Sequence, residues 1–369
     1  MKDPRVQKLA EVLVRYSTTV QPGDKVAIRG EALAAPLIRE VYAQVLQAGG
    51  HPLVNVELPG MQKLFYQYAS DEQLRFIQPP LKLMAETFDV NISIRGAANT
   101  KALTNVDPAR VVLEQQAHRE LMETFLRRAA SGELRWTLTL FPTDAHAQDA
   151  EMSLSEYEDF VFGACLPDPD DPVGWWQRLS DYQAKVVNYF KGKERVRVVG
   201  PDTELTLSIA GRTFINSDGH HNMPSGEVFT GPVEDSAEGH VHFSFPAVTR
   251  GREVEDVQLW FEKGKVVKAT AQKGEDFLLK MLDTDQGSRY LGEFAIGTNT
   301  GITGFTRNIL FDEKIGGTFH LAVGAGYPET GSRNQSAIHW DMICDLRQGG
   351  EIYVDDVLIH KDGKFVLEF

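Results

Sequence analysis

The sequence predicts an α/β N-terminal domain with a largely parallel sheet, followed by a mostly antiparallel α+β C-terminal domain. In the first half, helical stripes of apolar residues alternate with short apolar strands, a pattern that favours parallel strands covered by helices. After residue 194, strands and tight turns predominate. With roughly 150 residues per domain as a guide, the length of 369 residues supports two domains, which we place at 1–192 and 193–369.

Apolar periodicity and helix-start signals define the elements of the first domain. Asp107 and Pro108 begin a long helix, because aspartate caps the free N–H groups of a first turn and proline is tolerated there. Gly49 and Gly50 end an earlier helix. The predicted helices cover 6–16, 33–45, a segment from 107 onwards and 171–192, and the predicted strands cover 25–30, 52–56, 89–94 and 135–140.

Turn signals define the second domain. Lys263-Gly264 and Asp362-Gly363 each lie between short apolar runs, and both pairs suit two-residue hairpin turns because glycine readily adopts positive φ. The other predicted elements are strands over 195–199, 205–209 and 240–245 and a helix over 275–282.

The charge balance excludes one class of partner. Asp and Glu total 52 against 38 Lys and Arg, a formal charge of −14, and no basic patch interrupts this excess. A phosphate backbone would be repelled by such a surface, so we expect no nucleic-acid partner.

Cysteine usage and hydropathy predict a cellular location. Cys165 and Cys344 lie far apart in the sequence, and we expect both to be packing residues in a reducing compartment. The first residues lack an apolar leader, and no run of about 18 apolar residues occurs. We therefore expect a cytoplasmic protein with no membrane partner.

Two classes of enzyme lack their sequence motifs. There is no Gly-x-Ser-x-Gly segment of the kind that presents a nucleophilic serine. Gly324-Ala325-Gly326 lacks the third glycine of a dinucleotide-binding loop and does not begin a clear helix. We therefore expect neither a serine hydrolase of that type nor a nicotinamide enzyme.

Histidine and aspartate side chains of the second domain are candidate metal ligands. If the segment around His339 is a strand, His339 and Asp341 lie on one face while Trp340 and Met342 point to the other. The alternative is a polar pair at a solvated strand end. His320 lies in an apolar run where an imidazole needs a partner, and the alternative is a satisfied core histidine.

Three glutamates extend this set. Glu227 and Glu293 each follow a glycine and precede apolar residues, where a free carboxylate would lose hydration; surface turn glutamates are the alternative. Glu313 is either a further ligand or the ion-pair partner of Lys314. Together with the two histidines, these residues supply the imidazole and carboxylate donors that two neighbouring divalent ions need.

Several blocks that contain these residues resemble one family when taken together. The blocks are 222–230, 292–299, 311–314, 320–328 and 338–341. Their order and content resemble the aminopeptidase T (thermophilic metalloaminopeptidase) family, and the first half is similar in length and pattern. The resemblance implies a cytosolic metallo-aminopeptidase with two divalent ions, zinc, cobalt or manganese. It also implies a homodimer that encloses its active sites in an internal cavity.

The resemblance assigns roles block by block. Glu293 would bridge the two ions, and Glu293 and Tyr327 would be the catalytic residues. The spacing from Glu313 to His320 is longer than the family pattern, and the stretch from Tyr327 to His339 is shorter. The implied metal ligands are Glu227, Glu293, His320, His339 and Asp341, with Glu313 as a sixth candidate. The polar residues that match no family block, for which we expect solvated or structural roles, are His220, His221, His240, His242, Glu234, Asp235 and Glu238.

The expected reaction is release of N-terminal residues from peptides that have a free N-terminus. Two ions would bring the pKa of a shared water from roughly 15.7 toward neutrality, which makes a hydroxide available for attack on the first peptide carbonyl. One ion would polarise that carbonyl and the other would receive the α-amine. Two alternatives stay open: a non-catalytic two-domain binding protein with one structural cation, and a dinuclear amidohydrolase or phosphoesterase.

Overall fold

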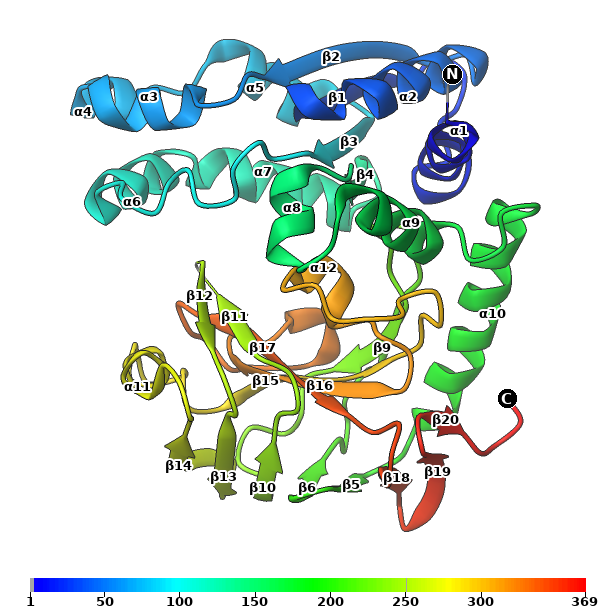
Figure 1. Ribbon diagram of the computed structural model, residues 1–369, viewed down its shortest axis with the longest axis vertical. Helices are drawn as coiled ribbons and strands as arrows, with labels where there is room; N and C mark the ends of the chain where they lie inside the picture. The colour runs from blue at the N-terminus through cyan, green and yellow to red at the C-terminus, as the bar shows by residue number, and fades with distance from the viewer. Residues whose placement is uncertain (1–2, 250) are drawn as a thin grey trace. The chain divides into compact units, whose positions relative to one another are not determined.

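Contacts within the chain define two units, each with sheets of its own (Figure 1). The structure is a computed structural model that describes residues 3–249 and 251–369. The predicted boundary, between 192 and 193, lies just after α10 (Pro172–Phe190), and the division by contacts falls inside this helix. The two units are Met1–Trp176 with Gly219–Pro224, and Gln177–Asp218 with Ser225–Phe369.

The first unit is built on a parallel sheet, as the sequence predicts. Every neighbouring pair of its strands runs parallel, and the last strand comes from the short segment Gly219–Pro224. In spatial order, the strands of the described chain are β2 (His51–Glu57), β1 (Lys25–Glu31), β3 (Val90–Arg95), β4 (Arg135–Leu140) and β8 (Asn222–Met223). The helical segments are α1 (Pro4–Glu11), η1 (Val12–Ser17), η2 (Ala32–Ala34), α2 (Ala35–Gln47), α3 (Met61–Tyr68), α4 (Asp71–Arg75), α5 (Pro79–Thr87), α6 (Pro108–Ala117), α7 (Arg119–Ala130), α8 (Asp144–Asp149) and α9 (Leu154–Cys165).

Close packing of a helix explains one residue choice in the central strand. Val26 and Ile28 of β1 are fully buried, and Gly30 lies on the same face by the period of two. A Cβ atom at Gly30 would lie 2.9 Å from Ile38 Cδ1 of α2. Glycine therefore lets this helix approach the sheet, which places the helix on the apolar face.

Two helical predictions for this unit were wrong in detail. Leu33 lies in η2, before α2 begins, and it is exposed rather than part of the buried stripe. The predicted long helix is two helices, α6 and α7, which meet at His118. Asp107 does cap α6, because its side chain accepts a hydrogen bond from the Ala109 N–H. His118 has φ −83° and ψ 2°, outside the helical region, and its ring bonds back to the Glu114 carbonyl at 2.9 Å.

The second unit contains two antiparallel sheets that share one apolar core (Figure 1). The larger sheet of the described chain contains, in spatial order, β14 (Lys265–Thr270), β13 (Gln258–Glu262), β10 (Glu238–His242), β6 (Thr203–Ser208), β5 (Arg195–Gly200), β18 (Glu351–Val354), β19 (Val357–Lys361) and β20 (Lys364–Phe365). The smaller sheet contains β17 (His339–Asp345), β16 (Thr318–Gly324), β15 (Leu291–Gly297), β9 (Glu227–Thr230) and β7 (Ile215–Ser217). The remaining elements are the hairpin β11 (Ala247–Thr249) and β12 (Arg252–Val254), the helices α11 (Glu275–Leu282) and α12 (Ile309–Asp312), and η3 (Pro328–Thr330).

Both predicted hairpins are present. Lys263 and Gly264 join β13 to β14 with φ values of 48° and 77°. Asp362 and Gly363 join β19 to β20 with φ values of 47° and 80°. Two consecutive residues with positive φ match the twist of antiparallel strands, which explains why these pairs carry a glycine.

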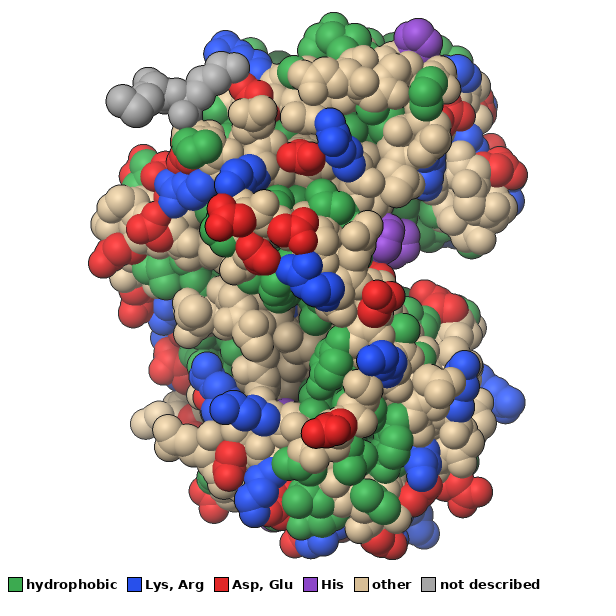
Figure 2. Space-filling view, turned by 90° about the vertical axis from the view of Figure 1, so that its right-hand side faces the viewer, with side chains coloured by type: hydrophobic (Ala, Val, Ile, Leu, Met, Phe, Trp, Pro, Cys, Tyr) green, Lys and Arg blue, Asp and Glu red, His purple; other side chains and the backbone are tan. Residues whose placement is uncertain are grey.

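The surface charges and the two cysteines lie where the sequence analysis expects them. Acidic and basic side chains are interspersed on the face shown in Figure 2. Cys165 and Cys344 are both buried free thiols, as expected of packing residues. Among the described residues, no helix has the length and apolar character needed to cross a membrane.

A buried histidine in β19 makes the stability of the second unit depend on pH. His360 is 1% exposed, and its Nδ1 atom has no hydrogen-bond partner in the described part of the chain. Burial lowers the pKa of His360 from 6.5 to about 4. The folded state therefore favours the neutral ring more than the unfolded state does, and this stabilisation is present above pH 6.5 and lost as the pH falls toward 4.

We predict that replacing His360 reduces the acid sensitivity of the fold. In the wild type, the size of this pKa shift lowers the free energy of unfolding by up to about 3 kcal/mol between pH 6.5 and 4. The His360→Leu variant should show a shallower decrease, measured by urea denaturation at several pH values. His51→Leu, which removes an exposed histidine of β2, should keep the wild-type slope. Equal slopes for wild type and His360→Leu would contradict the prediction.

Candidate metal centre

Three neighbouring strands of the smaller sheet bring the predicted ligands onto one face. In the antiparallel register, Glu293 of β15 lies opposite Ala322 of β16, and Ala322 lies opposite Asp341 of β17. Residues directly opposite each other share a face of the sheet. His320 and His339 join this face by the period of two. The small side chain of Ala322 between the two carboxylates leaves room for them to converge.

The opposite face of the same strands forms part of the core. Its side chains are large and buried, and they pack in the apolar cluster shared with the larger sheet. Those contributed by the three strands are Leu291, Phe294, Ile296, Phe319, Leu321, Val323, Trp340, Met342 and Cys344. The predicted alternation around His339 is therefore confirmed, because Trp340 and Met342 point into this core. Packing on one side holds the ligand-bearing side in a fixed register.

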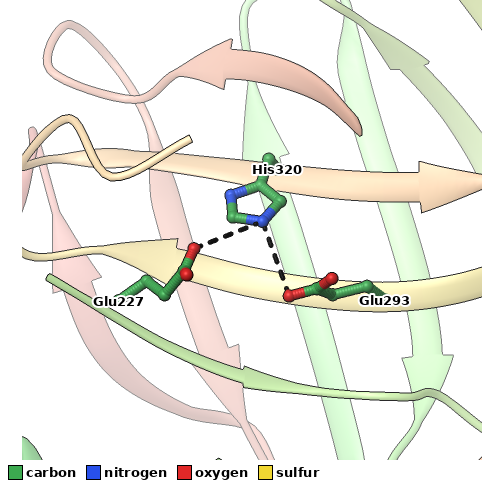
Figure 3. Close-up of side chains that lie close together, drawn as sticks. All are labelled: Glu227, Glu293 and His320. Atoms are coloured by element: carbon green, nitrogen blue, oxygen red, sulfur yellow. Dashed lines mark ion pairs between the residues drawn. The ribbon is translucent and has the colours of Figure 1, made fainter. Parts of the chain in front are cut away.

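His320 lies between two glutamates in the buried part of the site (Figure 3). Its Nε2 atom is 3.6 Å from Glu227 Oε2 and 3.7 Å from Glu293 Oε1. Glu227 comes from the first position of β9, where Gln183 of α10 donates a hydrogen bond to its backbone carbonyl at 3.2 Å. Both glutamates are 5% exposed. The alternative interpretation of these residues as surface turn glutamates is wrong.

His339 forms a second group with Glu293 and Asp341. Its Nε2 atom lies 3.2 Å from Glu293 Oε2 and 3.3 Å from Asp341 Oδ1. The other ring nitrogen, Nδ1, is 2.7 Å from the Ala325 carbonyl oxygen, to which it donates. Such a second hydrogen bond fixes the ring and leaves Nε2 for a metal ion. Glu293 faces one imidazole with each of its two oxygens, as a bridging carboxylate would.

Glu313 is the ion-pair partner of the adjacent Lys314, and its role as a metal ligand stays a prediction. It also offers an oxygen within 4.8 Å of donor atoms of His320 and Asp341, and these three residues form a third possible ligand group. Lys314 itself was missed as a site residue. Its side chain is fully buried, and its Nζ atom lies 3.7 Å from Glu227 Oε1.

The neighbouring carboxylates favour the protonated form of both imidazoles. Burial lowers the pKa of His320, but Glu293 and Glu227 outweigh burial and raise it to about 9. Burial also opposes the charged form of His339, yet Asp341 and Glu293 raise its pKa to about 12. Protons on these rings supply positive charge that the carboxylates require, and a metal ion would have to displace them.

The carboxylates respond to burial and to their partners in different ways. Burial raises the pKa of Glu313 to about 8, although Lys314 favours its charged form. Burial also raises the pKa of Glu227. For Asp341, the effect of burial is outweighed by His339, and the pKa falls to about 2. The site therefore holds more acidic groups than it can keep ionised without additional positive charge.

The donor atoms fit divalent cations. Glu227 Oε2 and Asp341 Oδ1 are buried oxygens without a hydrogen-bond partner among the described residues. Buried polar atoms are rarely left unpaired, and here they point toward the imidazoles of the site. Mixed imidazole and carboxylate donors suit zinc, cobalt and manganese. The three possible ligand groups are Glu227–Glu293–His320, Glu293–His339–Asp341 and Glu313–His320–Asp341.

Tyr327 is 40% exposed and its ring contacts that of the proposed ligand His339. Its ring is 5.2 Å from the ring of His339 and 5.5 Å from that of Phe229, in edge-on contacts. Burial and the neighbouring carboxylates, Glu293 first among them, raise the pKa of its hydroxyl. The hydroxyl therefore stays protonated and is a hydrogen-bond donor at neutral pH.

The other histidines and acidic residues lie outside these groups. His242 pairs with Asp256 at 2.6 Å, and Glu234 pairs with Arg212 at 2.6 Å. These are structural contacts, in agreement with the expectation from the sequence. The only sequence signal for Lys314 was its position beside an acidic candidate, and that signal equally fits a surface pair.

Comparisons with known proteins also indicate a metalloprotease. A model of the thermophilic metalloprotease (M29) family matches residues 2–365. Aminopeptidase 2 of Geobacillus stearothermophilus is 26% identical over 98% of this chain and 91% of its own length. Aminopeptidase T of Thermus aquaticus is 29% identical over 88% of this chain and 85% of its own length.

A solved structure supports the fold independently. AmpT from Thermus thermophilus superposes with a TM-score of 0.85 at 23% identity, and the match covers 99% of both chains. At this identity the likeness shows the architecture, a parallel N-terminal sheet followed by antiparallel sheets. Since the family model matches nearly the whole chain, the chain belongs to the thermophilic metalloprotease (M29) family.

Proposed function

We propose that this protein is an aminopeptidase that uses two divalent ions to release the N-terminal residue of peptides. The observation that carries the proposal is the convergence of six donors in three overlapping groups, each with its donor atoms within 4.8 Å of one another. Membership of a metalloprotease family supports metal-dependent peptide hydrolysis. The aminopeptidase names of the relatives support action at a free N-terminus. The proposed ligands are Glu227, Glu293, Glu313, His320, His339 and Asp341.

The ions and their ligands have separate tasks in this proposal. When bound, divalent ions supply Lewis acidity and lower the pKa of water toward neutrality. Glu293 is the proposed bridging ligand, because its two oxygens face different histidines. His339 is fixed by its hydrogen bond to the Ala325 carbonyl, so the ring is oriented before any ion binds. Zinc, cobalt and manganese all suit this donor set.

The free amine of the substrate accounts for the proposed specificity. Glu227, Glu293, Glu313 and Asp341 place four carboxyl groups in one region of the second unit, and the ammonium group of Lys314 pairs with Glu227 and Glu313. One of the two ions held there would receive a neutral α-amine at the start of a peptide, whereas the nitrogen of an internal peptide bond is a poor ligand. Cleavage would therefore be restricted to the first residue.

Two side chains are proposed to assist bond cleavage. Burial raises the pKa of Glu313, and a carboxyl group in this position is a candidate to accept and return a proton. We assign to it the transfer of a proton to the leaving nitrogen, with Glu293 as the other candidate. Tyr327 is proposed to donate a hydrogen bond to the oxygen that becomes negatively charged in the transition state.

The buried thiols and the surface support two further proposals. Free thiols at Cys165 and Cys344 fit a reducing compartment, and we place the protein in the cytoplasm. We also propose a homodimer formed through the edge strand β2. Tyr42, Val54 and Val56 are exposed and line one depression beside this edge, and unpaired edge strands readily add a neighbour.

Activity and metal content test the proposed function directly. The purified protein should contain two divalent ions per chain and hydrolyse leucine para-nitroanilide. Chelation should abolish activity, and Zn²⁺, Co²⁺ or Mn²⁺ should restore it, as measured by absorbance and elemental analysis. N-acetylated substrate should resist cleavage, because acetylation converts the free amine into an amide that cannot bind an ion as an amine does.

The Glu293→Gln variant tests the proposed bridge. We expect it to lose bound metal and at least about 100-fold in kcat/KM, since loss of outer-shell partners alone costs up to that factor. Glu262→Gln, which changes an exposed glutamate at the end of β13, serves as the matched control and should behave like the wild type. Full activity with two bound ions in Glu293→Gln would contradict the assignment.

A separate prediction concerns Tyr327→Phe. Removal of the hydroxyl should lower kcat by about 100-fold, the size found for loss of one transition-state donor. Metal content should stay at the wild-type value, because no ligand is changed. A loss of bound metal in Tyr327→Phe would instead assign the hydroxyl to the support of the metal ligands.

The dimer is tested at β2. Val54→Lys should convert the protein to a monomer, because a charge placed on the apolar edge opposes association; light scattering during gel filtration measures this. Val267 of β14 is also an exposed valine on an edge strand, so Val267→Lys is the matched control and should stay dimeric. A monomeric wild type, or a dimeric Val54→Lys, would overturn the proposed interface.

A further inference from the structure

Lys314 is a buried lysine inside the proposed metal centre. Its side chain has no exposed surface, and its Nζ atom lies 3.7 Å from Glu227 Oε1. The same ammonium forms an ion pair with Glu313. It makes no ion pair with Glu293 or Asp341 in the described part of the chain. Lys314 therefore contacts two of the four carboxylates of the site and leaves the other two to the histidines.

From this asymmetry we infer that Lys314 is a resident counter-ion that makes the two ion sites unequal. The Glu293–His339–Asp341 group, which Lys314 does not contact, binds a divalent ion first and tightly. The part of the centre that depends on Glu227 and Glu313 binds its ion later and more weakly. This inference rests on the proposed function, because it assumes that the site holds two ions.

Competition for oxygen atoms is the first reason. A carboxylate oxygen that is paired with an ammonium group is less available to a metal ion, and the ammonium group repels a divalent ion nearby. Glu227 and Glu313 form ion pairs with this ammonium group, whereas the ion pairs of Glu293 and Asp341 in the described part of the chain are with imidazoles. A ring nitrogen of an imidazole can itself serve as a metal ligand, whereas an ammonium group offers only hydrogen-bond donors.

Charge balance is the second reason. With neutral imidazoles, four carboxylates and one ammonium leave an excess of three negative charges. The first divalent ion enters this field and reduces the excess to one. A second ion then makes the centre positive, so it gains less attraction than the first. Without the charge of Lys314, two divalent ions would balance the four carboxylates.

The local structure keeps Lys314 in place. It follows α12, and its backbone N–H donates to the Phe311 carbonyl at 3.0 Å while its own carbonyl accepts from the Asn299 N–H at 3.1 Å. The Asp312 side chain accepts from the Thr306 N–H at 2.7 Å and from the Thr306 hydroxyl at 2.8 Å. This segment is therefore fixed on both sides of Glu313, and the ammonium cannot swing out to solvent without breaking buried contacts.

The test is an equilibrium titration of metal-free protein with Zn²⁺, followed by calorimetry and by analysis of bound metal. The wild type should bind two ions in separate steps that differ by about 10-fold or more in dissociation constant. In Lys314→Met, the weaker step should tighten by about 10- to 100-fold, the range typical of groups next to metal ligands. Lys314→Arg keeps the charge and should keep two separate steps.

Two further variants control for net charge and for folding. Lys273→Met removes an exposed lysine that pairs with Glu255 and with none of the proposed ligands among the described residues, so it makes the same change in net charge and should titrate like the wild type. If Lys314→Met fails to fold, His339→Gln still tests the order of binding in a chain with Lys314 present. It should lose the tight step and retain the weak one.

The possible outcomes separate the inference from the proposed function. Two equal steps in the wild type, an unchanged weak step in Lys314→Met, or loss of the weak step in His339→Gln would overturn the inference while leaving a two-ion centre intact. Failure of the wild type to bind any divalent ion would overturn the proposed function itself.

Discussion

The demand of buried carboxylates for positive charge is the constraint on which this structure depends. Four acidic side chains lie together in the second unit, and burial penalises each of their ionised forms. Two imidazoles and one ammonium group supply positive charge beside them, and one oxygen each of Glu227 and Asp341 has no hydrogen-bond partner in the described part of the chain. Protons, a lysine and divalent ions are thus alternative carriers of the same required charge. The chemistry proposed for the site requires that divalent ions, rather than protons, supply most of this charge.

The small antiparallel sheet makes this concentration of charge tolerable. Its central strands β15 and β16 are buried on both faces, with aromatic and aliphatic side chains packed on one face and ligands projecting from the other. Repulsion between carboxylates would push a flexible loop apart, but here it acts on a backbone held by a hydrogen-bonded ladder and by the core. Small residues such as Ala322 provide the remaining space. The packed core therefore holds the carboxylates close together against their mutual repulsion.

The sequence predicted those parts of the fold and site that depend on local pattern. The period of two around His339 placed His339 and Asp341 on one face, and the hairpins at Gly264 and Gly363 followed from turn chemistry. Long-range effects were out of reach. The break between α6 and α7 occurs without proline or glycine, and the pair Glu313-Lys314 reads like a surface ion pair until the fold turns both side chains inward. The blocks that resemble the family located the site because they record positions that only the folded chain brings together.

The route of the chain between the units has a consequence for biosynthesis. Strand β8 belongs to the first unit, yet it is separated from β4 by all of α10 and the first strands of the second unit. On a ribosome, the parallel sheet cannot gain its last strand until more than forty residues beyond Trp176 have emerged. The N-terminal sheet is therefore completed only while the second unit is being translated. For the same reason, no single proteolytic cut can separate the two units with both intact.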